Sequence, residues 1–192
     1  MKMLKVPAIL HEFFGKKIFL LDLCLTLLFG IGMSALILTV TSSQWLHLDV
    51  WKSMLLAILA FDITGGVLAN FTSSTNHYYQ QNAKVRLIFI SIHLQPIVLG
   101  FLFVPYIWIC LSVWGYTITS ALLVNHLVKH PGQRTIAAFL VTSSICILLL
   151  FQLLPAILSC LLCLYMFKVI FAFAVDHDNN NPNQKQVYKS RF

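Results

Sequence analysis

The sequence predicts an all-α, polytopic integral membrane protein with about six transmembrane helices and short loops. Of its 192 residues, 59% are hydrophobic and 10% are charged, and the mean hydropathy is +0.84. A soluble domain is about 45–50% apolar and about 25% charged. The apolar residues also form runs of the roughly 17–25 residues that a spanning helix needs. Nucleic-acid binding is not expected despite the net charge of +7, because the basic residues lie at the ends of these runs.

The first 17 residues, MKMLKVPAILHEFFGKK, form a basic segment ahead of the first long apolar run. We expect a short amphipathic helix on the cytoplasmic leaflet, with Pro7 in its first turn. A basic topology anchor is the alternative interpretation. A cleaved signal peptide is not expected, because no small-x-small cleavage pattern follows. The hydrophobic face would consist of Val6, Ile9, Leu10, Phe13 and Phe14.

Six apolar runs follow and make up the predicted transmembrane domain, residues 18–175. Proline disfavours helix at the residue before it and cannot donate a backbone hydrogen bond. Tight turns are therefore expected at Pro105 and Pro155. An alternative merges residues 136–175 around one re-entrant piece. The predicted spans are Ile18–Thr41, Met54–Phe71, Leu87–Val104, Tyr106–Val128, Ile136–Leu153 and Ala156–Val175.

Lysine and arginine residues gather on one side of the predicted spans. With the N-terminus inside, 11 of the 13 fall in cytoplasmic segments, whereas Lys52 falls outside and Lys168 within the last span. The positive-inside rule then places both termini in the cytoplasm, next to an anionic inner leaflet. The polar residues 176–192 are expected to form a disordered cytoplasmic tail. The 11 residues are Lys2, Lys5, Lys16, Lys17, Lys84, Arg86, Lys129, Arg134, Lys185, Lys189 and Arg191.

The second predicted span carries a stripe of small and polar residues. Asp62, Gly65, Gly66 and Ala69 are three or four residues apart, and Asn70 lies at the edge of their stripe. The glycines are expected to let another helix approach closely. They could instead loosen the helix and free backbone carbonyls for a ligand. The aspartate has no packing explanation, and an ionisable residue inside a span is by default a functional candidate.

The third span offers a partner for Asp62. A cytoplasmic loop, residues 72–86, joins the two spans, so they are expected to run antiparallel. Asp62 and His93 then lie at matching depth, roughly 10–12 Å inside the boundary. We expect them to touch and to exchange protons near neutral pH. Gln95 and Pro96 follow in HLQP, where the proline should kink the helix or free a carbonyl. The alternative is a pair that only fastens two helices.

Further polar residues are predicted at the same leaflet. Asp22 and Lys168 are expected to neutralise each other. The others suggest a cavity open to the cytoplasm, with a ligand or proton site formed by Asp62, Asn70, His77, His93, Gln95 and Asn125. Imidazole and carboxylate groups are metal ligands, so the candidate metal ligands are Asp62, His77, His93 and His126.

Three functions fit these features. The first is binding or proton-coupled transport of a small solute or ion in the cell membrane, with a homodimer as one arrangement. The second is a membrane-embedded enzyme, with or without a metal, that acts on a lipid or other amphiphile. The third is a structural or accessory membrane protein. No inverted repeat supports the first, and no HExxH or GxSxG motif supports the second. The sequence leaves the identity of any cofactor open.

Overall fold

The computed structural model describes residues 3–7, 11–80, 83–128 and 130–177. Helices make up most of this chain, and six of them, of 18 to 23 residues each, are long and apolar enough to cross a membrane. The six predicted apolar segments are thus confirmed as separate helices, with ends shifted by a few residues. They are Leu20–Val40, Val50–Phe71, Lys84–Leu102, Val104–His126, Gln133–Phe151 and Ala156–Phe173.

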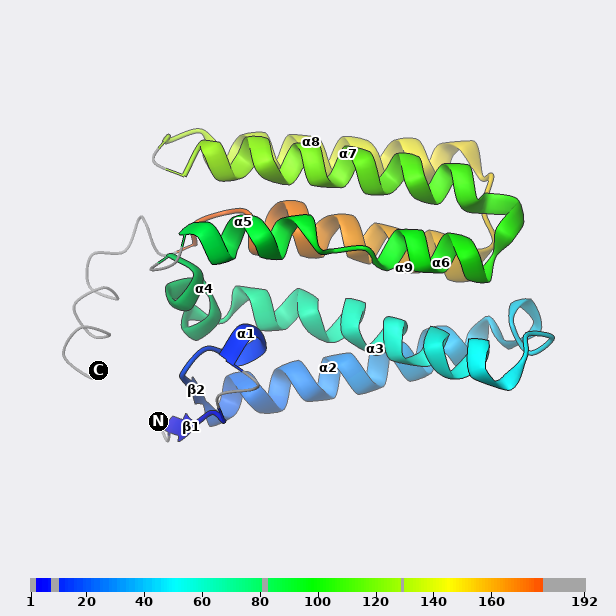
Figure 1. Ribbon diagram of the computed structural model, residues 1–192, viewed down its shortest axis with the longest axis horizontal. Coiled ribbons are helices and arrows are strands. Elements are labelled where there is room, and N and C mark those ends of the chain that lie inside the picture. The colour runs from blue at the N-terminus through cyan, green and yellow to red at the C-terminus, as the bar shows by residue number, and fades with distance from the viewer. Residues whose placement is uncertain (1–2, 8–10, 81–82, 129, 178–192) are drawn as a thin grey trace.

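The helices lie side by side in a bundle, with the last one between the others (Figure 1). In the last segment 61% of residues are buried, against 22% in the first and 11% in the fifth. The last helix is therefore the core of the bundle. The elements of the bundle are α2 (Leu20–Val40), η2 (Ser42–Gln44), α3 (Val50–Phe71), α4 (Ser73–Gln80), α5 (Ala83–Ser91), α6 (Gln95–Leu102), η3 (Val104–Tyr106), α7 (Ile107–His126), α8 (Gln133–Phe151), α9 (Ala156–Met166) and η4 (Phe167–Phe173).

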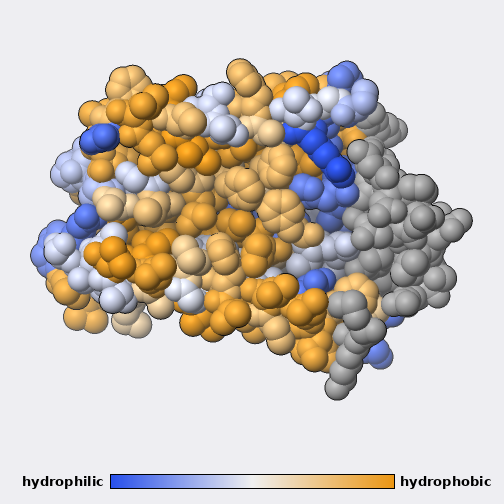
Figure 2. Space-filling model, turned by 180° about the vertical axis from the view of Figure 1, so that it is seen from behind, coloured by the Kyte–Doolittle hydropathy of each residue, from blue (hydrophilic) through white to orange (hydrophobic). Residues whose placement is uncertain are grey.

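Hydrophobic side chains cover the middle of the molecule, whereas hydrophilic ones gather at its two ends (Figure 2). One end holds α4, the strands β1 (Met3–Lys5) and β2 (Lys17–Phe19), and the start of α8 (Figure 1). The other end holds the α2–α3, α6–α7 and α8–α9 connections. Both predicted proline turns are confirmed: Pro105 lies in η3, and Pro155 caps the start of α9.

The short amphipathic helix expected within residues 1–17 is reduced to one turn, and Ile9 and Leu10 of its predicted hydrophobic face lie outside the described residues. Strands β1 (Met3–Lys5) and β2 (Lys17–Phe19) pair antiparallel, and the short helix α1 (His11–Phe14) lies between them. Gly15 has a φ of 67°, which reverses the chain after α1. A Cβ at Gly15 would lie 2.6 Å from the Ser74 carbonyl oxygen, so only glycine fits against α4.

The sequence also predicts a loop over residues 72–86 and a disordered tail over residues 176–192. The segment expected as a loop, residues 72–86, is largely helical, because α4 begins directly after α3. The Thr72 hydroxyl accepts a hydrogen bond from the Thr75 backbone N–H at 3.4 Å, as at many helix starts. The predicted disordered tail lies outside the described residues, apart from Asp176 and His177.

Helices α2 and α3 pack closely through glycine. A Cβ at Gly30 would lie 3.0 Å from the Cα of Gly65, and the Thr64 hydroxyl donates a hydrogen bond of 3.0 Å to the Gly30 carbonyl. Close approach of this kind is what small residues at helix interfaces permit. The packing interpretation is therefore confirmed for Gly65, which leaves the role of Gly66 to be explained.

Candidate functional site

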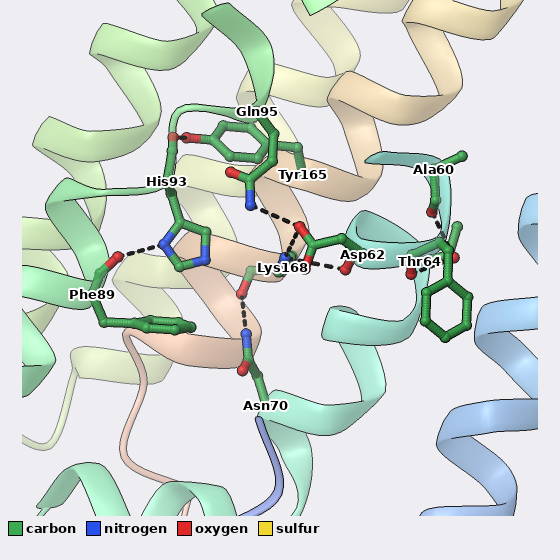
Figure 3. Close-up of polar contacts among 10 residues, drawn as sticks. Ala60, Asp62, Thr64, Asn70, Phe89, His93, Gln95, Tyr165 and Lys168 are labelled. Atoms are coloured by element: carbon green, nitrogen blue, oxygen red, sulfur yellow. Dashed lines mark hydrogen bonds and ion pairs between the residues drawn. The ribbon is translucent and has the colours of Figure 1, made fainter. Parts of the chain in front are cut away.

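An ion pair between α3 and η4 lies at the centre of the candidate site (Figure 3). Lys168 Nζ lies 3.0 Å from Asp62 Oδ2 and also donates to the Asp62 backbone carbonyl at 3.1 Å. The lysine side chain is 3% exposed and the aspartate side chain 31%. The expected pairing of Lys168 with Asp22 is therefore wrong, because the lysine extends toward α3.

Gly66 provides the space through which Lys168 reaches Asp62. A Cβ at this position would lie 2.3 Å from Lys168 Cε and 2.7 Å from Nζ. The two adjacent glycines thus have different roles: Gly65 contacts α2, whereas Gly66 accommodates the lysine. Lys168 itself lies in a π-helical segment, a rare geometry that occurs frequently at functional sites.

A break between α5 and α6 places Gln95 beside the ion pair. The helix ends at Ser91 and resumes at Gln95, with proline in its first turn, which confirms the predicted kink. Gln95 Nε2 donates to Asp62 Oδ2 at 2.8 Å. The His93 carbonyl, freed by the break, accepts a hydrogen bond of 2.9 Å from the Tyr165 hydroxyl. The break therefore turns the Gln95 amide toward Asp62 and fastens the chain to α9.

His93 is 3% exposed and lines the same cavity as the ion pair. Its Nδ1 is 2.5 Å from the Phe89 carbonyl oxygen. Because a carbonyl can only accept, Nδ1 carries the proton, and Nε2 of the neutral ring is an acceptor. In Figure 3 this second nitrogen lies on the side of the ring toward Lys168. Among the described contacts His93 has no hydrogen bond to Asp62, so the expected direct pair is corrected: Lys168 and Gln95 occupy the carboxylate.

A cavity of about 170 Å³ joins these groups. Four of the six predicted site residues line it, together with Lys168. Asn70 takes part through its Nδ2, which lies 3.5 Å from the Lys168 carbonyl oxygen. The polar lining residues are Asp62, Asn70, His93, Gln95 and Lys168. The cavity therefore combines a carboxylate, an ammonium group, an imidazole and two amides.

The remaining predicted residues lie elsewhere. His77 belongs to α4 and lines a different hollow, whereas Asn125 and His126 are at the end of α7. The four candidate metal ligands are thus not brought together. Within the residues that the structure describes, no group of three or more His, Cys, Asp or Glu side chains could hold a metal ion. His77 is separated from Asp62 because α4 is a helix of its own after α3, and His126 lies at the end of a different helix, α7.

Two features of this region were not expected from the sequence. The sequence suggests Asp22 as the partner of Lys168, although a lysine within an apolar span is itself a signal for a buried carboxylate partner. Arg86 is expected only as a topology charge, yet it is 4% exposed. Its guanidinium donates to the carbonyls of Phe173 and Ala174 at 3.2 and 2.8 Å. Gln133 also donates to the Ala174 carbonyl. Arg86 and Gln133 thus provide hydrogen-bond donors for backbone carbonyls at the end of the last helix, which have no partner within the helix.

The helices and the buried site define a class: a helical bundle of membrane-type composition with an ion pair in its interior. Comparison with protein-family models, with curated proteins and with solved structures gives no match for this chain. The function is therefore inferred from the site itself.

Proposed function

We propose that this chain is a multi-pass protein of the cell membrane that binds and transports a small solute or ion, with proton exchange at the same site. The observation that carries the proposal is the cavity in which Asp62, Lys168, His93 and Gln95 meet. Charged side chains are costly inside a membrane and mark substrate, ion or proton pathways.

The free acceptors of the cavity indicate the chemistry of its ligand. Gln95 Oε1 is buried and has no hydrogen-bond partner among the described residues. His93 Nε2 and the Asp62 carboxylate are further acceptors. A ligand with positive charge or with N–H or O–H donors would satisfy all three. The volume of about 170 Å³ is below the roughly 300–1,000 Å³ of pockets for drug-sized molecules, which favours an ion or a solute of few atoms.

The same arrangement supports proton exchange as part of the proposal. The Phe89 carbonyl fixes the proton of His93 on Nδ1, so the ring can accept a second proton only at Nε2, which faces the ion pair (Figure 3). A cationic ligand at Asp62 would compete with Lys168 for Oδ2. A change in the charge of this small cavity is then balanced by proton gain or loss at a neighbouring group.

We infer that both termini are cytoplasmic. The elements that carry basic residues at their ends, β2, α5 and α8, begin at the same end of the molecule as α4 (Figure 1). Lys52 lies near the start of α3, at the opposite end. Basic residues are retained on the cytoplasmic side of membrane helices. This orientation places the cavity closer to the cytoplasmic face.

Topology reporters test the orientation. Reporter domains fused at residues 82 and 192 should give cytoplasmic signals, and one inserted at residue 48 should give an external signal. The physical reason is the excess of basic residues at one end. Accessibility of tagged sites to a membrane-impermeant thiol reagent is the second measurement. An external signal at residue 192 would contradict the six-span arrangement.

Proton flux tests the function. The purified protein is placed in liposomes that contain a pH-sensitive dye, and gradients of monovalent cations, small amines and polyols are applied. At least one gradient should drive proton movement. His93→Gln should abolish it, because an amide keeps a hydrogen bond but does not take up a proton. The double variant Asp62→Asn/His93→Gln should be hardly slower than either single variant, since residues that act as a unit are non-additive.

The matched control is His126→Gln, which changes the same residue type at the exposed end of α7. This variant should keep the wild-type flux. A folded protein that moves no protons with any of the gradients, or a His93→Gln variant with unchanged flux, would overturn the proposal.

A further inference from the structure

A second hollow adjoins the ion-pair cavity, where α3 packs against α2. Its volume is about 200 Å³. Asp62, Gly66 and Ala69 line both spaces, so the two adjoin along one stretch of α3. We call this second space the α2–α3 hollow. Its large apolar side chains are Phe14, Leu27, Ile58 and Phe61.

The α2–α3 hollow opens on the outside of the bundle. Helix α2 lies at the edge of the bundle, beside α3 (Figure 1), and Leu27, Ile58 and Phe61 are exposed. Both helices are long and apolar enough to cross a membrane. In a bilayer the hollow would therefore face lipid tails, and a molecule dissolved in the membrane could enter it sideways.

Two polar atoms at the α2–α3 hollow have no hydrogen-bond partner among the described residues. The first is the hydroxyl of Thr26, which lines the hollow and is 4% exposed. The second is Asp62 Oδ1, because Lys168 and Gln95 both donate to Oδ2. A polar atom left unpaired in apolar surroundings is costly. A ligand that brings N–H or O–H groups would satisfy both atoms.

The charges at the hollow favour a cation over an anion. Lys168 is 3% exposed and lines the ion-pair cavity but not the α2–α3 hollow, whereas the Asp62 side chain is 31% exposed and lines both. None of the described lining residues of the hollow is basic. The hollow thus presents a carboxylate among apolar side chains. A charge-assisted hydrogen bond from an ammonium group is about twice as strong as a neutral one, and the apolar wall suits a short hydrocarbon group.

We propose that the solute of this protein is an amphiphilic amine. Its ammonium group donates to Asp62 Oδ1 and to the Thr26 hydroxyl oxygen, and its hydrocarbon group occupies the α2–α3 hollow. This inference rests on the binding of a solute at Asp62 in the proposed function and names the class of that solute. The hydrocarbon group sets the specificity, because each buried methylene raises the affinity about fourfold. An inorganic cation lacks this contribution.

The test measures the binding of hexylamine to the full-length protein in detergent by isothermal titration calorimetry, with methylamine and hexanoate for comparison and empty micelles as the blank. Hexylamine should bind about 60-fold more tightly than methylamine, since three buried methylenes contribute about fourfold each. Hexanoate has the same hydrocarbon chain but should not bind, because its carboxylate would meet that of Asp62.

Thr26→Val keeps the shape of the side chain and removes the hydroxyl. The affinity for hexylamine should fall about tenfold with the loss of one hydrogen bond to a charged group. The Tm without ligand should equal or exceed that of the wild type, because an unpaired buried hydroxyl has been replaced by an apolar group. The matched control is Thr39→Val, at an exposed position of the same helix, which should keep the affinity.

A second variant fills the hollow from its rim. Ile58→Trp enlarges an exposed side chain of the lining, so it should reduce the affinity for hexylamine to that for methylamine without overpacking the core. Its control is Ile147→Trp, at an exposed isoleucine of α8, which should bind hexylamine like the wild type.

Three results would overturn this inference: equal affinities for hexylamine and methylamine, binding of hexanoate as tight as that of hexylamine, or unchanged affinity in both Thr26→Val and Ile58→Trp. The transport proposal can fail separately. If hexylamine binds as described to the wild type and to His93→Gln, but no gradient drives proton movement, the ligand class stands and transport alone is overturned. If a gradient of an inorganic cation drives the flux and hexylamine does not bind, the reverse holds.

Discussion

Replacing Lys168 with methionine is expected to lower the free energy of unfolding by about 3 kcal/mol, because it leaves a charge without its partner inside the bundle. The Asp62 carboxylate loses a contact of 3.0 Å and keeps only the Gln95 amide as a side-chain donor. The lower end of the usual range applies, since the aspartate side chain is 31% exposed. Methionine preserves the volume of the lysine stem. Denaturant titration in mixed micelles measures the change.

A second substitution separates charge from packing. Adding Asp62→Asn to Lys168→Met should recover most of the lost stability, because the unpaired charge is gone while the shape is kept. The control Lys52→Met breaks the surface pair with Asp49, at 2.7 Å and with side chains 32% and 62% exposed. Exposed pairs contribute little, so its unfolding should be close to that of the wild type. Wild-type stability of Lys168→Met itself would refute the buried ion pair.

Alanine is expected to destabilise the protein at Gly66 of α3 and to have little effect on stability at the adjacent Gly65. Gly66→Ala places a Cβ 2.3 Å from Lys168 Cε, so the end of the buried lysine side chain must shift and its contact with Asp62 is disturbed. Overpacking of this kind costs about 1–3 kcal/mol. Gly65→Ala brings its Cβ to 3.7 Å from Gly30 Cα, an ordinary contact. That variant should lie within about 1 kcal/mol of the wild type, since alanine also favours the helix.

The proton flux of the two glycine variants should differ in the same way as their stability. Gly66→Ala should lose the solute-dependent proton flux, because the displaced lysine changes the charge of the cavity, whereas Gly65→Ala should keep most of it. Thermal unfolding and the liposome assay measure the two quantities on the same preparations. Equal behaviour of the two variants would mean that Gly66 does not serve Lys168.

Much of the helical framework follows from local properties of the chain. The six long apolar helices, the two proline turns and the break in the third span depend on the length of apolar runs and on where proline removes a donor. The packing role of Gly65 also follows from residue size. Of the candidate site, Asp62, Asn70, His93 and Gln95 could be chosen because polar groups in apolar runs are costly.

The partner of Asp62 within the site could not be predicted from these local properties. Asp62 has several polar residues within reach at similar depth, and local sequence does not rank them. The outcome depends on Lys168, 106 residues away in the chain, whose position is set by the burial of the last helix at the centre of the bundle. His93 lies in the break between α5 and α6, where its backbone N–H bonds to the Ile90 carbonyl and its ring is left to bond to the Phe89 carbonyl.

Amphipathic spacing at the N-terminus likewise predicted a helix, whereas the structure has a hairpin. Local periodicity did not reveal that Gly15 would adopt a positive φ against the Ser74 carbonyl. The sequence by itself therefore determined which segments are apolar helices and which polar residues lie within them. The tertiary structure alone decided which of those residues meet, because an ion pair in a low-dielectric interior forms only between groups that packing brings within a few ångströms.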